Sequence, residues 1–430
     1  MASAYGSVLV DVDDDERTEL LFNHTALIHG HGPVMEAVSP GHSQAQRSRC
    51  IPRRGNPEGR TMHELIVSPF LGTHLVLRPG QPNAIRISRD KYTQLQSTGP
   101  DGLCPDWLSD AVMKSWRIDV SDRPLRDFAI LRAPSLLGYG RASYELNMGC
   151  NYDCKHCYLG LKEFAGLEFA EREKILGSMR DAGVLWLQLT GGEPTIDRLF
   201  RDTYATAFDL GMMIEVLTNG SRLSNPAILD LLTSHPPHRV TLSVYGATEA
   251  SYDGLTQRRG AYKSFIRGLS AAHEAGISLD LSIVITKDNC HEIDAMHALA
   301  DGLGIKYRDY TKMSPTIYGG AETLTSQSLP HLTVSKPFTG CDAGHTSFHV
   351  DPHGRASICK VGREPNIALA DEGLEGLHRL GGIADQLLRR QGGCSGCTLS
   401  AQCGTCMPLA AKYREANSPL DRYCQHKERR

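Results

Sequence analysis

Apolar and polar positions alternate along residues 143–310 in a way that predicts strands and helices in turn. Six short apolar runs are separated by longer segments of helical periodicity, such as Glu171–Asp181 and Tyr262–Ala275. Strands that alternate with helices of this length favour a parallel sheet. We expect this α/β sheet to curl into a partial (β/α)6 barrel. The expected strands are Ser143–Met148, Val184–Thr190, Met213–Leu217, Arg239–Val244, Leu279–Ile285 and Ile305–Tyr310.

Chemically unusual motifs follow the first two expected strands. Cys150 opens a cysteine-rich loop just after the first strand, and the sequence Gly-Gly-Glu-Pro at 191–194 follows the second. On barrels of the TIM type, functional sites lie at the carboxyl ends of the strands. Both motifs are therefore expected on the same rim of the barrel.

The chain before the barrel divides into an extension and a small folded module. Residues 1–62 show little periodicity and become rich in Pro, Gly, Ser and Arg after position 39, so we expect a flexible N-terminal extension. Residues 63–130 contain strand patterns near 65–67, 75–77 and 85–87, and helical patterns at Arg89–Gln96 and Asp106–Trp116. We interpret this segment as a small α+β module.

Composition narrows the classes of function. The 430 residues suffice for two or three domains, and 22% charged residues with a net charge of -3 give no reason to expect a nucleic-acid or membrane partner. No run of about 18 apolar residues predicts a membrane span. Acidic residues at 11–16 stand where a signal peptide would need positive charge. We therefore expect a cytoplasmic protein.

Thirteen cysteines are many for a cytoplasmic chain, in which thiols stay reduced. Metal or catalytic use is therefore favoured over a disulfide framework. Cys50, Cys104 and Cys290 stand alone and are expected to be inert small apolar residues. The other ten fall into a group of three at 150–157 and a group of seven at 341–424.

The first group has the spacing Cys-x3-Cys-x2-Cys, at Cys150, Cys154 and Cys157. A purely structural [4Fe–4S] cluster normally has a cysteine on each of its four irons. Three thiolates leave one iron open for a substrate or a cofactor. Taken alone, the triplet is also compatible with a fragment of a zinc knuckle. The glycine motif on the same rim favours the iron–sulfur interpretation.

With both motifs, the chain resembles the radical S-adenosylmethionine (radical SAM) enzymes. The resemblance implies that the three cysteines hold a [4Fe–4S] cluster whose open iron binds S-adenosylmethionine. In that family the cofactor is cleaved to a 5′-deoxyadenosyl radical, which abstracts hydrogen from the substrate. Glu193 would then accept a hydrogen bond from the ammonium group of the methionine part of the cofactor. The residues that the resemblance assigns to cofactor binding are His156, Tyr158, Gly191, Gly192, Glu193, Pro194, Asn219 and Ser243.

The second group of cysteines resembles the SPASM extension of radical SAM enzymes, which carries two auxiliary [4Fe–4S] clusters. We expect this cysteine-rich iron–sulfur domain at 341–430, joined by a linker at 313–340 to the barrel at 140–312. By this resemblance Cys341, Cys359 and Cys406 hold one auxiliary cluster. Its remaining iron is open, bound by substrate, or held by Asp342 or His345. The resemblance assigns the other auxiliary cluster to Cys394, Cys397, Cys403 and Cys424.

One spacing in the tail departs from this resemblance. Cys403 and Cys406 are separated by two residues, where the family pattern has three. Together with Cys394 and Cys397 they are also compatible with a four-thiolate zinc site. Zinc would leave the other three tail cysteines unexplained.

SPASM enzymes mostly act on peptides or proteins, so the resemblance implies an oxidative modification. We expect a maturase that forms a carbon–carbon, carbon–oxygen or thioether crosslink in a ribosomally made precursor peptide. An external donor of flavodoxin or ferredoxin type would supply electrons. The module at 63–130 loosely resembles leader-peptide recognition elements, and it is equally compatible with a structural cap.

Two other activities stay open. One is a small-molecule radical SAM dehydrogenase. The other is a sulfatase maturase that makes formylglycine, a group with an aspartate after the cysteine that matches Cys359. Here that residue is Lys360. The sequence assigns no catalytic residue for the substrate.

Overall fold

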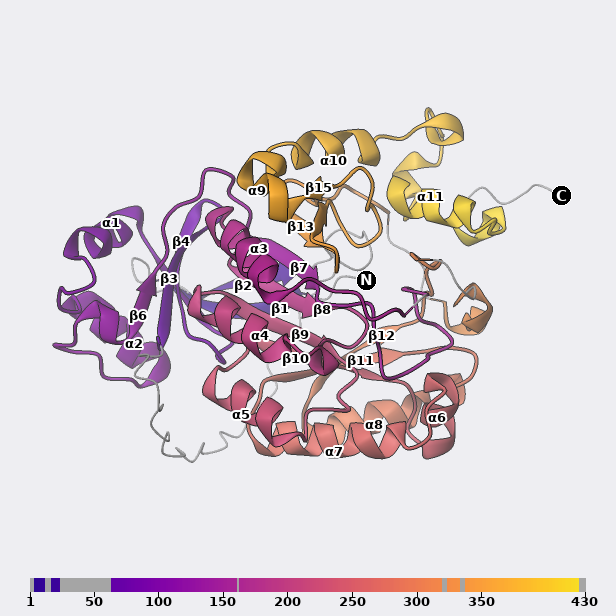
Figure 1. The fold of residues 1–430 in the computed structure, drawn as a ribbon, viewed down its shortest axis with the longest axis horizontal. Coiled ribbons are helices and arrows are strands. Elements are labelled where there is room, and N and C mark those ends of the chain that lie inside the picture. Colours follow the sequence, from indigo (N-terminus) through magenta and orange to yellow (C-terminus); the bar gives the residue numbers. More distant parts are fainter. Residues whose placement is uncertain are drawn as a thin grey trace.

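The computed structural model describes residues 4–11, 17–23, 63–160, 162–318, 323–332 and 337–424. Within these residues the chain forms two sheets, one of six strands and one of nine (Figure 1). Cys50 and residues 24–62 of the expected extension lie outside the described part of the chain.

Six neighbouring parallel strands form one side of the larger sheet and include one of its edges. The prediction of a parallel α/β sheet is confirmed, and every expected strand is present within a few residues of its expected bounds. The strands are β7 (Arg141–Glu145), β8 (Trp186–Thr190), β9 (Met213–Thr218), β10 (Arg239–Val244), β11 (Leu279–Val284) and β12 (Lys306–Tyr310).

Helices connect these strands and bury one face against them. In the helix after β10, Phe265 and Leu269 lie one turn apart, and both are buried. The helix after β9 begins at Pro226, and Asn225 caps it by accepting a hydrogen bond from the backbone N–H of Ala227 at 3.0 Å. The helices are α3 (Phe169–Asp181), α4 (Phe200–Asp209), α5 (Pro226–Ser234), α6 (Glu249–Thr256), α7 (Ala261–Glu274) and α8 (Ile293–Leu303).

The N-terminal module has its own sheet and its own core. Ser88 caps its first helix by accepting from the backbone N–H of Lys91 at 3.3 Å. The strand order is β2-β1-β5-β4-β3-β6, so two strands from within residues 1–62 extend the sheet beyond β5. Residues 1–62 were expected to form a flexible extension, so these two strands differ from the expectation. The elements are β1 (Ala4–Asp11), β2 (Arg17–Asn23), β3 (Leu65–Phe70), β4 (Thr73–Leu77), β5 (Ala84–Ile87), α1 (Arg89–Thr98), α2 (Asp106–Trp116) and β6 (Ala129–Leu131).

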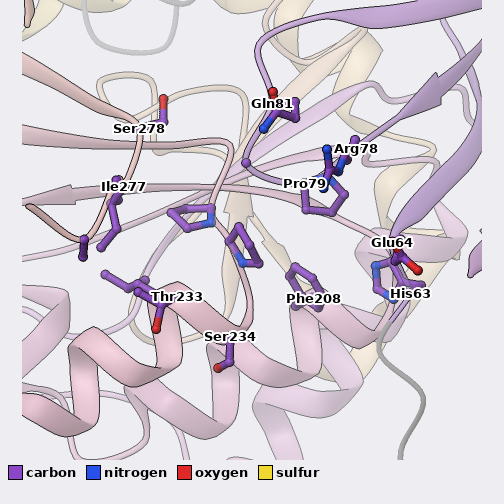
Figure 2. A pocket seen from close by; sticks show the side chains of 16 residues that line it. His63, Glu64, Arg78, Pro79, Gln81, Phe208, Thr233, Ser234, Ile277 and Ser278 are labelled. Atoms are coloured by element: carbon purple, nitrogen blue, oxygen red, sulfur yellow. The ribbon is translucent and has the colours of Figure 1, made fainter. Parts of the chain in front are cut away.

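The module packs against the amino-terminal ends of the parallel strands. The rings of Phe70 and Trp186 meet edge to face, with centroids 4.7 Å apart. A cavity lies between His63 of the module, Phe208 of the helix before β9 and Ile277 of the loop before β11 (Figure 2). It lies at the opposite end of the strands from Cys150 and is therefore separate from the cysteine loop.

The C-terminal tail continues the larger sheet. Its first strand, β13 (Ser347–Val350), pairs in parallel with β7, and β14 (Arg355–Ser357) and β15 (Ile367–Ala368) follow as antiparallel strands. The described part of the tail also contains the helices α9 (Leu369–Leu377), α10 (Leu380–Leu388) and α11 (Met407–Glu415). Figure 1 shows α9 and α10 above the sheet and α11 to the right of them. Among the described residues, no helix has the length and apolar character that crossing a membrane requires.

Candidate functional site

The loop after β7 carries all three cysteines of the first group. Backbone hydrogen bonds fix it at two places. The N–H of Leu146 donates to Thr190 at the end of β8 at 2.9 Å, and the N–H of Asp153 donates to Thr256 at the end of α6 at 2.9 Å. The loop is therefore held between the carboxyl end of the sheet and a neighbouring helix.

The three thiols lie close enough to influence one another. Burial raises the pKa of Cys154 well above its usual range, and Cys157 and Cys150 raise it further. Burial and the nearby Glu193 raise the pKa of Cys150 to about 12. Metal binding would have to displace these protons, because the thiolate is the ligand.

The cysteine loop suits an iron–sulfur cluster rather than a single metal ion. Among the described residues, no three His, Cys, Asp or Glu side chains converge tightly enough to hold a single metal ion. The cysteines of a [4Fe–4S] cluster bind different irons, so their sulfur atoms stand further apart than the ligands of one ion. Three mutually close thiols on one loop, lining one cavity, fit such a cluster.

The glycines at 191 and 192 let the loop after β8 press against the cysteine loop. A Cβ atom on Gly192 would lie 2.1 Å from the carbonyl oxygen of Gly149, and one on Gly191 would lie 2.3 Å from that of Asn147. Gly191 also has a φ of 136°, which favours glycine. The N–H of Gly192 donates to Asn147 at 2.9 Å. The two motifs are thus one packed unit.

Glu193 lies beneath this unit and is fully buried. Its carboxylate accepts from the hydroxyl of Thr218 at 2.7 Å, from the backbone N–H of Asn219 at 2.7 Å, and from the N–H and hydroxyl of Thr195. Glu193 and Pro194 do not line the cavity beside the cysteines. In the structure, Glu193 therefore joins the loop after β8 to the end of β9. Its expected hydrogen bond to the methionine ammonium stays a prediction.

One cavity brings most of the expected site together at the carboxyl ends of the strands. It holds about 1350 Å³ of empty space, counting the part open to solvent, which exceeds the ~300–1,000 Å³ of a typical small-ligand site. Six of the eight expected cofactor-binding residues line it together with the three cysteines. These six are His156, Tyr158, Gly191, Gly192, Asn219 and Ser243.

Residues from beyond the parallel strands reach the same cavity. Lys312 follows β12, and Lys360 and Val361 come from the tail, directly after Cys359. Lys360 is buried and donates from Nζ to Oε1 of Gln188 on β8 at 3.0 Å. Burial lowers the pKa of Lys360 to about 8. Sequence reasoning noted Lys360 only by comparison with an aspartate and did not place it in the site.

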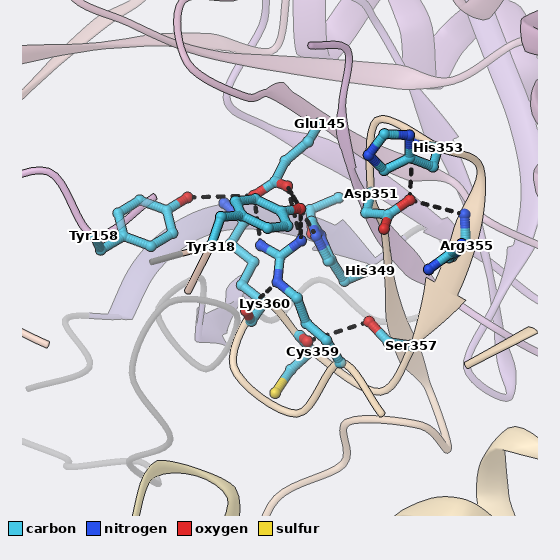
Figure 3. A network of polar contacts seen from close by, with 12 residues as sticks. Glu145, Tyr158, Tyr318, His349, Asp351, His353, Arg355, Ser357, Cys359 and Lys360 are labelled. Atoms are coloured by element: carbon cyan, nitrogen blue, oxygen red, sulfur yellow. Dashed lines mark hydrogen bonds and ion pairs between the residues drawn. The ribbon is translucent and has the colours of Figure 1, made fainter. Parts of the chain in front are cut away.

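A buried polar network joins the tail to the end of β7 (Figure 3). Glu145 is fully buried and accepts two hydrogen bonds from the guanidinium of Arg363, at 2.8 and 2.9 Å. The hydroxyls of Tyr158 and Tyr318 also donate to it, at 3.4 and 3.2 Å. Burial raises the pKa of Glu145, but His349 and Arg363 outweigh this effect and hold the pKa well below its usual range.

The tail brings together the three cysteines expected to hold one auxiliary cluster. Burial raises the pKa of Cys406 to about 12, and Cys359 and Cys341 raise it further. The two residues considered as a fourth ligand have other contacts, since Asp342 accepts from the hydroxyl of Thr346 and His345 pairs with Asp385. The grouping agrees with the sequence expectation, while the cluster itself stays a prediction.

The remaining tail cysteines lie around α11. Cys394 ends a short 3₁₀ turn, Cys397 and Cys403 flank another, and Cys424 follows a third. Their assignment to a second auxiliary cluster stays a prediction.

Comparison with known proteins decides the identity of the central part of the chain. The model of the radical SAM superfamily matches residues 144–300. These residues form a radical SAM domain. The enzymes of this superfamily use S-adenosylmethionine and a [4Fe–4S] cluster, and the cysteine loop and the cavity beside it lie within the matched segment.

The similarity to curated proteins extends beyond the radical SAM domain. The mycofactocin maturase MftC of Mycobacterium ulcerans is 27% identical over 321 residues, which is 65% of this chain and 85% of that protein. The PqqA peptide cyclase of Rhizobium meliloti is 28% identical over 189 residues, which is 43% of this chain and 50% of that protein.

Among solved structures, SuiB of Streptococcus suis bound to its precursor peptide SuiA has a similar fold. The TM-score is 0.55 with 16% sequence identity, and the superposition covers 84% of this chain and 98% of that one. The shared fold therefore includes regions on both sides of the radical SAM domain.

Proposed function

We propose that this radical SAM enzyme forms an oxidative crosslink between side chains of a ribosomally made precursor peptide. The larger sheet would be the partial (β/α)6 barrel of the family, and the tail would be a SPASM domain with two auxiliary clusters. One relative is named as a maturase and another as a peptide cyclase, which supports the substrate class. The alignment with the maturase spans 321 residues and therefore extends beyond the radical SAM domain.

The observation that carries this proposal is that the tail lines the radical SAM cavity. Val361 and Lys360 border the same space as Cys150 and Cys157, and both directly follow Cys359. An auxiliary cluster on Cys341, Cys359 and Cys406 would thus stand next to a substrate bound in this cavity.

A crosslink removes two hydrogen atoms from the peptide. One leaves as a hydrogen atom, and the other leaves as a proton and an electron. When bound, S-adenosylmethionine and the cluster on Cys150, Cys154 and Cys157 supply the radical chemistry for the first removal. An auxiliary cluster in the tail would supply an acceptor for the electron. The chain's own contribution is to hold the cysteine loop and the tail at a fixed separation.

The N-terminal module would bind the leader part of the peptide. The edge strands of its sheet are β2 and β6, and strand edges accept extended peptides through backbone hydrogen bonds. The external electron donor would be of flavodoxin or ferredoxin type.

The experiment has two arms. In the first, the anaerobically reconstituted protein is reduced with S-adenosylmethionine present, and 5′-deoxyadenosine is measured. In the second, the protein is coexpressed with short reading frames that neighbour its gene, and each peptide is weighed by mass spectrometry. A loss of about 2 Da per crosslink is expected.

Each arm has a distinct negative outcome. Absence of 5′-deoxyadenosine would reject the radical SAM reaction. Formation of 5′-deoxyadenosine with a gain of oxygen in the product, or with turnover of small molecules alone, would reject the crosslinking of a peptide. A variant with Cys290 replaced by Ala is the matched control, because Cys290 lies outside the cavity lining.

A further inference from the structure

Exposed cations border the cysteine loop. Lys155 lies on the loop, between Cys154 and Cys157, and its side chain is 45% exposed. The chain as a whole has a net charge of -3, so composition does not predict a group of cations at this place. Four further exposed cations lie on segments beside the loop, namely Arg222, Arg258, Arg259 and Lys287.

Two of these four cations directly follow α6. The backbone N–H of Asp153 donates to the carbonyl oxygen of Thr256, the last residue of α6, at 2.9 Å. Arg258 and Arg259 come two and three residues later. Each step along the backbone spans only ~3.8 Å, so both arginines lie beside the loop.

Hydrogen bonds fix the turn that carries the two arginines. The carboxylate of Asp253 accepts from the backbone N–H groups of Gly260 and Tyr262, at 2.5 and 2.9 Å. The N–H of Arg258 donates to the carbonyl oxygen of Asp253 at 3.2 Å. The arginines therefore extend from a backbone whose position is set, and Asp253 is bound to that backbone.

The other two cations border the loop from two further segments. Arg222 follows Ser221, whose hydroxyl accepts from the side-chain amide of Asn151 at 2.9 Å. Lys287 precedes Asp288, the ion-pair partner of the loop lysine, at 3.0 Å. Cations thus gather beside the loop from parts of the chain that are distant in sequence.

The two acidic side chains closest to the loop already have partners. Asp153 pairs with Lys162 at 2.5 Å, and Asp288 pairs with Lys155. Within the part of the chain that the structure describes, no ion pair is formed by Arg222, Arg258, Arg259 or Lys287. These four residues are called the donor surface below.

We propose that the donor surface binds an electron-carrier protein of flavodoxin type through an acidic face of that protein. The proposal rests on the proposed function, in which an external donor supplies the electron for the cluster on Cys150, Cys154 and Cys157. Opposite charges steer two proteins together and fix their orientation. Electron transfer slows steeply with distance, and the donor surface borders the loop that carries these three cysteines.

One electron is transferred in the docked complex. The anionic hydroquinone of the flavin loses it and becomes the neutral semiquinone, and the cluster takes it up. The donor surface holds the two proteins together and takes no part in the chemistry.

The first measurement is the binding of oxidised flavodoxin to the cluster-reconstituted protein by anaerobic calorimetry. We expect R222Q/R258Q/R259Q/K287Q to bind about tenfold more weakly than the unmodified protein, because it lacks the charges that attract the acidic partner. Arginine-to-lysine changes at the same three positions should retain binding. Higher salt should weaken binding to the unmodified protein and affect the glutamine variant little.

A matched control removes the same amount of charge elsewhere. It distinguishes the donor surface from the net charge of the chain, and its dissociation constant should equal that of the unmodified protein. The control replaces exposed cations of α3, α4, α7 and the end of α10, as K174Q/R201Q/R267Q/R389Q.

The second measurement is 5′-deoxyadenosine formation with S-adenosylmethionine and limiting reduced flavodoxin. The glutamine variant of the donor surface should be about tenfold slower, in line with its weaker binding. Excess dithionite, a small reductant that needs no docking surface, should give the same yield of 5′-deoxyadenosine in both proteins.

Four results would overturn the proposal. Flavodoxin binding could be absent from the unmodified protein, or equal in the unmodified protein and the glutamine variant. The control could lose as much binding as the glutamine variant, which would make the effect one of net charge. An equally large loss with dithionite would show that the four residues support the cluster. Normal flavodoxin binding with loss of the crosslink in a coexpressed peptide would assign the surface to the peptide.

Failure of the proposed function has a different signature. The calorimetry uses oxidised flavodoxin and needs no turnover. If the unmodified protein forms no 5′-deoxyadenosine with dithionite, the radical SAM reaction fails while the binding result stands.

Discussion

Glu145 and Arg363 form a bidentate ion pair that joins two parts of the chain 218 positions apart. The oxygen–nitrogen distances are 2.8 and 2.9 Å, and the side chains are 1% and 11% exposed. Glu145 is the last residue of β7, directly before the cysteine loop, and Arg363 lies four residues after Cys359. The pair therefore sets the position of the tail relative to the first group of cysteines.

Replacing Arg363 with Gln should destabilise the protein strongly. Glu145 would remain buried with a charge that the tyrosine hydroxyls cannot balance, and breaking a buried pair from one side costs about 3–5 kcal/mol. Arg363→Lys should cost less, because it retains the charge but not the bidentate geometry. The free energy of unfolding, measured by denaturant titration under anaerobic conditions, checks both values.

An exposed ion pair provides the control for this prediction. Arg198 pairs with Glu168 at the surface, with side chains 67% and 70% exposed. Arg198→Gln should leave stability unchanged within error, because exposed pairs contribute little. Similar losses for Arg363→Gln and Arg198→Gln would contradict the assigned role of the buried pair.

Local patterns in the sequence were sufficient to predict the six parallel strands β7 to β12 and the helices α1, α2, α3 and α7. The expected bounds of β10 and α2 agree with the structure, and Ser88 is the cap that its position before α1 indicated. Periodicity, caps and turn residues act over a few positions, so a single sequence reveals them. The cysteine spacing is equally local. The position of Cys150 just after the first expected strand indicated the carboxyl end of the sheet, where the structure has the cysteine loop.

Contacts between distant parts of the chain were not predictable in this way. The pairing of β13 with β7 places Ser347 beside Arg141, and no local pattern indicates it. The role of Glu193 was also hidden, because its acceptor atoms are filled by residues of β9 and the loops beside it. One signal was overlooked, namely that Glu145 is the one charged residue in the expected strand Ser143–Met148.

Gly192→Ala should disrupt the cysteine loop. The new Cβ would lie 2.1 Å from the carbonyl oxygen of Gly149, and because that atom belongs to the backbone, the loop itself would have to move. We expect a lower thermal midpoint and loss of about four irons per chain, those of the radical SAM cluster. Iron and sulfide determination after reconstitution measures the loss.

A helical glycine serves as the comparison for this variant. Gly254 lies in α6, and a Cβ there would meet no atom within 4 Å. Gly254→Ala should retain the full iron content and stabilise the helix by about 0.5–1 kcal/mol. If Gly192→Ala also keeps all of its iron, the close approach of the two loops is not needed to hold the cluster.

His63 should make stability depend on pH. Burial, with a smaller effect from His235, lowers the pKa of His63 to about 4 from 6.5. The unfolded chain therefore binds a proton below pH 6.5 that the folded protein resists until about pH 4. This effect lowers stability as the pH falls from 6.5 to 4, by up to about 3 kcal/mol, and it is constant below that range.

The variant His63→Phe isolates this effect. Phenylalanine retains the stacking on Phe208, whose ring centroid lies 4.7 Å from that of His63, but it cannot be protonated. Thermal midpoints at pH 7, 6 and 5 should fall less steeply for this variant than for the unmodified protein. His273→Phe, at an exposed position on α7, should keep the original slope. Parallel slopes for all three proteins would show that His63 is not the responsible group.

Replacing Cys150, Cys154 and Cys157 together with Ala should remove the radical SAM cluster and leave the tail intact. The tail is held by the pairing of β13 with β7 and by the Glu145–Arg363 pair, and neither involves these thiols. If all three clusters are [4Fe–4S], the iron content should fall from about twelve to about eight per chain, and 5′-deoxyadenosine formation should cease. Iron analysis alongside the nucleoside assay measures both. Near-complete loss of iron from this variant would mean that the tail cannot hold clusters by itself. Four irons with one zinc in the unmodified protein would instead support a zinc site on the tail cysteines.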